Sequence, residues 1–281
     1  MTAASSPITY TDDGFSILVV EPWVKQQVQI VRQYLTSFVN HLQGKVNQII
    51  LVDLVAGSGL YSLGANREIF PGVPLMAMGL DLPISKFVFC ENDPEQYKAL
   101  KIRVNRYFKD KNAVLLESKW DELAARLNLY VPPSKENFKT AVLCLCNPSS
   151  FEVPFDVMDR LAEKDFSFLI PFTFPLNGRI NYKHYIHQQH EKLKNYLGGY
   201  KDFEKLEKNV ASNTLFYKRL LAIYEKNMVA NEMNSFFSTH RLDSGLMEIP
   251  TYTMGLFSKL NSAKLIHRDV IESEFKQISL F

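Results

Sequence analysis

A glycine-containing turn follows the first strongly apolar segment of the chain, and its residue types suit ligand binding. The stretch reads Asp-Leu-Val-Ala-Gly-Ser-Gly-Leu-Tyr over residues 53–61 and comes directly after the apolar run 49–52. Glycine lets the backbone turn sharply and approach a ligand closely. In a parallel sheet, ligands bind beyond the carboxyl ends of the strands. The stretch therefore indicates a ligand-binding loop, and a tight turn without a ligand is the alternative.

A second acidic position supports the ligand interpretation. Glu91 and Asn92 follow the apolar segment 87–90, which predicts another strand. A carboxylate at a strand end can accept hydrogen bonds from both hydroxyls of a ribose, as in dinucleotide-binding folds. Acidic residues at two matching strand ends, Asp53 and Glu91, favour a nucleotide-type ligand over a plain turn.

The spacing of the glycines indicates which nucleotide-type ligand the loop suits. A dinucleotide fingerprint would require glycine at position 62, where the chain has serine, and no phosphate-binding GxxxxGK[ST] motif is present. An acidic residue ahead of Ala-Gly-Ser-Gly instead resembles the first motif of class I S-adenosylmethionine-dependent methyltransferases. The resemblance implies S-adenosylmethionine as cofactor, with the loop around its amino-acid half and Glu91 on its ribose. The loop and strand-two residues that it assigns to the cofactor are Asp53, Ala56, Gly57, Ser58, Gly59, Tyr61, Glu91 and Asn92.

A third motif follows the fourth predicted strand. The sequence Asn147-Pro148-Ser149-Ser150-Phe151 resembles the NPP[FY] signature of amino-group methyltransferases, with Ser149 in place of the second proline. The resemblance implies that Asn147 orients the target amine, that Pro148 fixes the backbone, and that Phe151 stacks on the target ring. A turn after a strand is the alternative interpretation of Asn-Pro.

A longer resemblance covers almost the whole chain. Seven segments, in order and spacing, are similar to the bacterial three-Cys-motif partner family: EPWVKQQVQIVRQYL, DLVAGSGLY, VPLMAMGL, FCENDPEQYKAL, NPSSFEVPFDVMDRL, FLIPFTFPLNGRINY and YTMGLFSKLNSA. It implies a methyltransferase-like fold and cofactor, not a particular reaction. The chain has Val55 where members usually have Phe, and Asn-Pro-Ser-Ser where they have Asp-Pro-Phe-Gly. It also has Glu117-Ser118 in place of Gly-Asp, so Ser118 would replace the usual contact to the adenine amino group.

Apolar segments alternating with helix-like segments predict the elements that position these motifs. Near-continuous apolar strands separated by helices are typical of a parallel sheet covered on both faces. Asp93 followed by Pro94 predicts a capped helix start directly after Glu91. We expect one domain over residues 1–281 with a Rossmann-like methyltransferase fold, that is, an α/β fold with a mostly parallel sheet and helices on both faces. Its predicted parts are a helix at about 21–44, strands at 48–54, 86–90, 113–116, 140–146 and 166–172, a helix at 120–129, a helical insertion at about 177–245, and returning strands at 251–257 and 275–281.

Composition excludes several classes of protein. The 32 basic and 30 acidic residues leave a net charge of +2, which gives no chain-wide attraction to nucleic acid. No apolar run is long enough for a membrane span and the N-terminus lacks signal-peptide features, so we expect a cytoplasmic protein that does not bind a membrane. The three cysteines are expected to be buried free thiols. His184, His187 and His190 are expected on a solvated or partner-facing helix rather than at a metal site.

Two functions of different classes follow. The first is transfer of a methyl group to an amine or another heteroatom of a nucleic acid, protein or metabolite. The second is a non-catalytic methyltransferase-fold module that binds a partner protein. Neither the acceptor, the partner, nor the oligomeric state is specified by the sequence.

Overall fold

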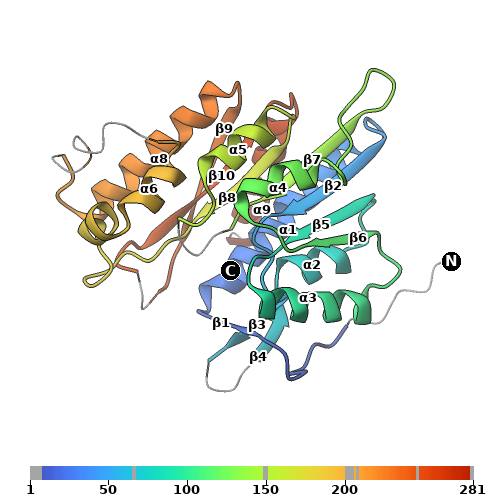
Figure 1. Cartoon of the computed structure of the whole chain (residues 1–281), viewed down its shortest axis with the longest axis horizontal. Helices are drawn as coiled ribbons and strands as arrows, with labels where there is room; N and C mark the ends of the chain where they lie inside the picture. Colours follow the sequence, from blue (N-terminus) through green and yellow to red (C-terminus); the bar gives the residue numbers. More distant parts are fainter. Residues whose placement is uncertain are drawn as a thin grey trace.

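Seven strands form one sheet through the middle of the molecule (Figure 1). The computed structural model describes residues 8–64, 68–147, 151–199, 206, 209–244 and 247–278. The first five strands of the sheet are mutually parallel, and the sixth runs antiparallel to both of its neighbours. In sheet order the strands are β6 (Ala113–Leu116), β5 (Lys86–Cys90), β2 (Gln48–Asp53), β7 (Thr140–Leu145), β8 (Ser167–Phe172), β10 (Thr251–Ser258) and β9 (Asn234–Arg241).

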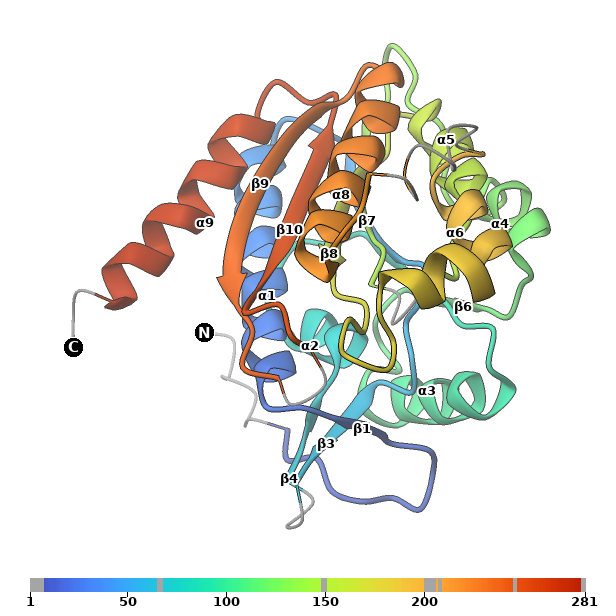
Figure 2. The same cartoon turned by 90° about the vertical axis from the view of Figure 1, so that its left-hand side faces the viewer.

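Helices cover both faces of this sheet (Figure 2). Alternate side chains of β2 point to opposite faces, so Ile50 and Val52 pack in one core and Ile49 and Leu51 in the other. The helices over the first core are α4 (Trp120–Leu127), α5 (Phe155–Ala162), η1 (His184–Gln188), α6 (His190–Tyr196) and α8 (Asn213–Ala230). Those over the second are α1 (Trp23–Leu42), α2 (Val73–Gly79), α3 (Pro94–Tyr107) and α9 (Ala263–Ile278). The predicted α/β class with a mostly parallel, doubly covered sheet is confirmed.

A smaller three-stranded sheet stands apart from the main one in both views (Figures 1 and 2). It contains β1 (Leu18–Val20), β3 (Leu60–Leu63) and β4 (Glu68–Pro71), with β1 parallel to β3 and β4 antiparallel to it. The two strands β3 and β4 occupy the long interval between the glycine loop and α2. Pairing with β3 brings the N-terminal strand β1 beside that loop.

The predicted strands and the N-terminal helix agree with the structure to within a few residues, but two predictions in the second half were wrong. The helical insertion was expected to reach about residue 245, whereas α8 ends at Ala230 and β9 pairs with β10 along its whole length. The C-terminal strand was expected from 275, whereas α9 continues to Ile278. Ala263, Ile266 and Val270 recur at helical spacing and pack in the same core as α1, so this segment buries its apolar face as a helix.

The start of α3 is fixed by the predicted cap. The Asp93 carboxylate accepts hydrogen bonds from the N–H groups of Glu95 and Gln96 at 3.0 and 2.9 Å. The cap holds the chain immediately after Glu91. Cys90, Cys144 and Cys146 are buried free thiols, as expected. No helix within the described ranges combines the length and apolarity needed to cross a membrane.

Candidate functional site

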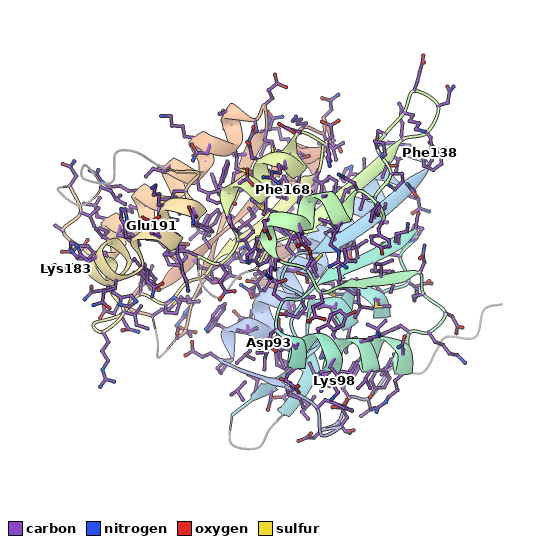
Figure 3. All side chains as sticks on the ribbon, viewed as in Figure 1. Asp93, Lys98, Phe138, Phe168, Lys183 and Glu191 are labelled. Atoms are coloured by element: carbon purple, nitrogen blue, oxygen red, sulfur yellow. The ribbon has the colours of Figure 1, made fainter. Side chains whose placement is uncertain are left out.

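A cavity of about 620 Å³ opens at the carboxyl ends of β2, β5 and β7. Gly57 from the loop after β2, Glu91 after β5 and Asn147 after β7 all line it. Figure 3 shows Asp93, another lining residue, at the carboxyl-end side of the strands, whereas Phe138, which precedes β7, lies at the opposite end. The cavity therefore lies where open α/β sheets bind their ligands.

The Glu91 carboxylate is held by backbone amides at the wall of this cavity. Glu91 is only 6% exposed. Its Oε2 accepts a hydrogen bond from Gly57 N at 2.7 Å, and its Oε1 accepts one from Asp93 N at 2.8 Å. Burial raises the pKa of Glu91, and these hydrogen bonds oppose that rise. A carboxylate has about four lone-pair sites, so acceptor capacity remains for a ligand hydroxyl.

The two glycines of the loop have different roles. Gly57 has a φ of 64° and lines the cavity, and a Cβ there would lie 3.0 Å from Leu18 Cδ1. Gly59 has a φ of 85° but does not line the cavity, and a Cβ there would lie 2.8 Å from Leu100 Cδ1. Gly57 is therefore positioned to contact a ligand, while Gly59 is required for packing of the loop against α3.

Asp53 lies behind this cavity rather than in its wall. It is 3% exposed, its Oδ1 accepts a hydrogen bond from Val55 N at 3.1 Å, and it lines a second, very small cavity together with Tyr61 and Asn147. Burial raises the pKa of Asp53 to about 7, with a smaller contribution from the Glu91 carboxylate. Burial likewise raises the pKa of Tyr61, which lines both cavities.

Asn147 is held by a residue that sequence analysis did not single out. Its Nδ2 donates a hydrogen bond to Gln27 Oε1 at 3.2 Å, and Gln27 comes from α1 and is only 2% exposed. Both side chains line the large cavity. The adjacent Pro148 lies outside the described residues.

Three predicted cofactor residues are buried without lining the cavity. Ala56, Ser58 and Ser118 are 3%, 0% and 6% exposed. The hydroxyl of Ser58 donates to Leu60 O at 3.1 Å and that of Ser118 to Lys119 O at 3.3 Å. These hydroxyls therefore serve local turns. Asn92, by contrast, lines the cavity and is exposed.

Phe151 is not placed for the predicted stacking role. It is 4% exposed, and its ring centroid lies 4.7–4.9 Å from those of Phe174, Tyr185 and Tyr196. These rings belong to the core beneath η1, α6 and α8. The helical segment therefore occupies the aromatic face that was assigned to a substrate.

A buried arginine joins the N-terminal segment to the glycine loop. Arg103 of α3 is 0% exposed and forms two hydrogen bonds with Asp13, Nη2 to Oδ1 at 2.6 Å and Nε to Oδ2 at 3.0 Å. Its Nη1 also donates to Ser16 O and Ser58 O. The guanidinium holds the pKa of the Asp13 carboxyl below its usual range. This contact positions β1, whose residues Leu18–Val20 form one wall of the cavity.

Several lining residues were missed because they come from distant parts of the chain, namely Trp23, Gln27, Trp120, Thr173, Pro175 and Met247. Of these residues, only Gln27 could have been found from the sequence, because it is a polar residue between Val24 and Val28 on the apolar face of the predicted helix. A polar residue on such a face needs a partner.

The predicted row of histidines does not share one regular helix, because η1 ends at Gln188 and His190 begins α6. Within the part of the chain that the structure describes, no group of three His, Cys, Asp or Glu side chains is arranged to hold a metal.

Solved structures share this fold at low sequence identity. Protein LPL1258 from Legionella pneumophila str. Philadelphia 1 (family model DUF519) superimposes with a TM-score of 0.52 and 12% identity, over 88% of this chain and 90% of that one. The METTL16 MTase domain gives 0.47 and 13%, over 88% and 75%. An rRNA methylase from Streptococcus thermophilus gives 0.42 and 10%, over 84% and 95%. No protein-family model and no curated protein matches the sequence.

The predicted Rossmann-like α/β fold, with a mostly parallel sheet and helices on both faces, is confirmed by the strand order, and the first of these solved structures shares the fold. When the strands of the main sheet are numbered along the chain, from β2 as strand 1 to β9 and β10 as strands 6 and 7, their order across the sheet is 3-2-1-4-5-7-6. Strands 1 to 5 follow the Rossmann order, and the antiparallel strand 7 lies between strands 5 and 6. At 12% identity the first superposition shows the fold alone, and no conclusion is drawn from the other two.

Proposed function

We propose that the chain is an S-adenosylmethionine-dependent methyltransferase that acts on an amino group. One observation carries the proposal: a single cavity joins Gly57 and Glu91, which suit the cofactor, with Asn147, which suits an acceptor amine. The carboxylate lies at the end of the strand next to the glycine loop, where a ribose is held in nucleotide-binding α/β folds.

The cavity fits such a cofactor by volume and by chemistry. Its volume of about 620 Å³ falls in the range of small-molecule sites. Glu91 would accept hydrogen bonds from the ribose, and the bare backbone at Gly57 would allow close approach. Tyr61 and Asn92 would line the same part of the site.

Asn147 would supply the positioning that methyl transfer requires. When bound, the cofactor would supply a methyl group on a positively charged sulfur: the nitrogen lone pair would form the new carbon–nitrogen bond, the electrons of the broken carbon–sulfur bond would stay on sulfur, and the methylated amine would release a proton to solvent. The Asn147 amide would accept a hydrogen bond from the amine and so direct its lone pair toward that methyl group. Gln27 restrains the Asn147 amide, so little reorganisation is needed when the acceptor binds.

The chain-long resemblance supports the more specific proposal of membership in the bacterial three-Cys-motif partner family. We propose that the amino group that accepts the methyl group belongs to a nucleic acid or a protein. Three buried free thiols suit a reducing compartment such as the cytoplasm.

The position of Phe151 favours a second candidate, a partner-binding module that does not transfer methyl groups. Burial of this ring removes the aromatic contact that the resemblance assigned to the acceptor. Under this alternative the cavity would bind the cofactor without turnover.

Calorimetric titration with S-adenosylmethionine and S-adenosylhomocysteine tests the proposal. We expect saturable binding of each at one site per chain and no binding of NAD, because the pyrophosphate-binding fingerprint is absent. Absence of binding by both sulfur compounds would refute the proposed cofactor. Binding without methyl incorporation into DNA, RNA or protein from radiolabelled cofactor would favour the partner-binding module.

A further inference from the structure

Asp53 carries a carboxylate oxygen without a hydrogen-bond partner among the described residues. Asp53 ends β2 and is 3% exposed, and its Oδ1 accepts the hydrogen bond from Val55 N. Its Oδ2 accepts none from any residue that the structure describes. Burial of a charged acceptor without a partner is costly, so a native fold that keeps one beside a ligand cavity needs a reason.

Asp53 borders a cavity with room for a single water molecule. This very small cavity behind the main one has a volume of about 10 Å³, close to the least that one water requires. Asp53, Tyr61 and Asn147 are its polar lining residues, and its other lining side chains are apolar. A buried water needs about two to four polar partners, and these three side chains can supply them.

The small cavity adjoins the place that the proposed function gives to the acceptor amine. Strands β2 and β7 are neighbours in the sheet, with Asp53 opposite Leu145, so the residues that follow the two strands lie side by side. Val55, Tyr61 and Asn147 line both cavities. A water in the small cavity would therefore lie between the Asp53 carboxylate and an amine held at Asn147.

We propose that Asp53, acting through one water in the small cavity, accepts the proton that the acceptor amine loses on methylation. This inference rests on the proposed function and specifies the route of its proton. The amine lone pair forms the carbon–nitrogen bond, and the electrons of the broken carbon–sulfur bond stay on sulfur. One N–H proton then passes to the water, which gives one of its own protons to Asp53 Oδ2. Asp53 becomes a neutral carboxylic acid and loses the proton to solvent after the product dissociates.

The surroundings of Asp53 favour a change of its charge near neutral pH. Burial raises the pKa of Asp53 to about 7, and the Glu91 carboxylate after β5 adds to this rise. A group with a pKa near the working pH can take up a proton and release it again. Helices α1 and α2 and strand β8 contribute apolar side chains to the small cavity. Strands β3, β5 and the end of β7 contribute four groups whose pKa is raised by burial, so that they stay neutral at pH 7: Tyr61, Cys90, Cys144 and Cys146.

The pH dependence of single-turnover methyl transfer, to whichever DNA, RNA or protein the wild-type chain methylates, tests the inference. We expect the rate at saturating cofactor and acceptor to rise with pH through a midpoint near 7. Asp53→Asn should lower the rate at pH 8 about 100-fold, within the usual contribution of a positioned proton acceptor, and should remove the midpoint. The variant should keep its affinity for S-adenosylhomocysteine, because Asp53 does not line the large cavity.

Glu152→Gln is the matched variant, because Glu152 is a carboxylate that lines the large cavity itself. We expect its rate profile to keep the midpoint near pH 7. Loss of the midpoint in Glu152→Gln but not in Asp53→Asn would assign the proton to Glu152 and overturn the inference.

Two further measurements do not need an acceptor. Infrared difference spectra of the cofactor-free chain between pH 6 and pH 8 should show the loss of a carboxylic-acid band that Asp53→Asn lacks. A crystal structure of the chain with S-adenosylhomocysteine should show one water hydrogen-bonded to Asp53 Oδ2 and to Tyr61 or Asn147.

The outcomes separate this inference from the proposed function. Failure of the wild-type chain to bind the cofactor, or to methylate DNA, RNA or protein, would overturn both. Methyl transfer with a midpoint that survives Asp53→Asn, identical infrared spectra for the two chains, or an ordered Asp53 without a bound water would overturn the inference alone.

Discussion

The Glu91 carboxylate accepts a hydrogen bond from the Gly57 N–H at 2.7 Å, and this contact ties the loop after β2 to the end of β5. Glu91 and Gly57 lie 34 positions apart in the sequence, yet they form one structural unit at the wall of the cavity. A substitution at either residue therefore alters the setting of the other.

Glu91→Gln should weaken the binding of S-adenosylmethionine by about 1.5–3 kcal/mol, the range for a hydrogen bond to a charged group. The amide keeps the shape of the side chain but loses the charge and one acceptor oxygen. Calorimetric titration measures the change. Glu95→Gln, at an exposed position in the first turn of α3, is the control and should bind normally. Equal affinities for the two variants would remove Glu91 from the site.

Gly57→Ala and Gly59→Ala should have opposite principal effects. Both residues have positive φ, so each substitution costs about 1 kcal/mol in backbone strain. At Gly57 the new Cβ would face the cavity and the end of the Leu18 side chain, so cofactor affinity should fall more than stability. At Gly59 it would meet Leu100 and Leu75, so stability should fall more. Titration and urea denaturation of both variants check this contrast, which the reverse pattern would contradict.

Asn147→Ala should retain cofactor binding and lose nearly all methyl transfer, since the change removes positioning of the acceptor rather than affinity for the cofactor. Single-turnover transfer from radiolabelled cofactor to whichever DNA, RNA or protein the wild-type chain methylates measures the loss, and titration measures cofactor binding. Transfer at the wild-type rate would show that Asn147 does not orient the acceptor.

Arg103→Met should lower the free energy of unfolding by about 3–5 kcal/mol, because it leaves the Asp13 carboxylate buried without its partner. The Asp13 side chain is only 4% exposed. Arg106→Met is the control, since Arg106 approaches the same carboxylate at 3.4 Å from a position that is 45% exposed. Urea denaturation of both variants should show a much smaller change for Arg106→Met.

Asp53→Asn should become more stabilising as the pH rises. The pKa of Asp53 is raised to about 7 in the folded protein, against about 3.9 in an unfolded chain. Between these values the folded state binds more protons, so this group lowers wild-type stability as the pH rises toward 7. The asparagine retains an oxygen for the Val55 N–H and has no charge to bury.

The stability difference between Asp53→Asn and wild type should therefore grow by about 2.5 kcal/mol from pH 5 to pH 8. Urea denaturation at both pH values measures it. Asp110→Asn, at an exposed position, provides the comparison. A difference that is constant with pH would show that Asp53 is ionised throughout this range.

The parallel strands and the glycine-containing turn after β2 could be predicted because their signals are local. An apolar run such as 140–145 predicts a strand, and the sequence Ala56-Gly57-Ser58-Gly59 predicts a turn, each from only a few neighbouring residues. The partners of Asn147 and Phe151 could not be predicted, since Gln27 is 120 positions before Asn147 and Tyr196 comes from α6. The role of Gly59 could not be predicted for the same reason. Its motif suggested contact with a ligand, whereas in the structure glycine is needed there because a Cβ would collide with Leu100, a residue distant in sequence.

The walls of the large cavity come from positions as far apart as Leu18 and Met247. Contacts of such long sequence separation require the chain to close large loops, which costs conformational entropy. The N-terminal wall is held to the rest of the molecule by Arg103 and by its pairing with β3. A ligand bound here therefore stabilises the whole native chain against global unfolding, and its protection against hydrogen exchange should extend to both halves of the molecule.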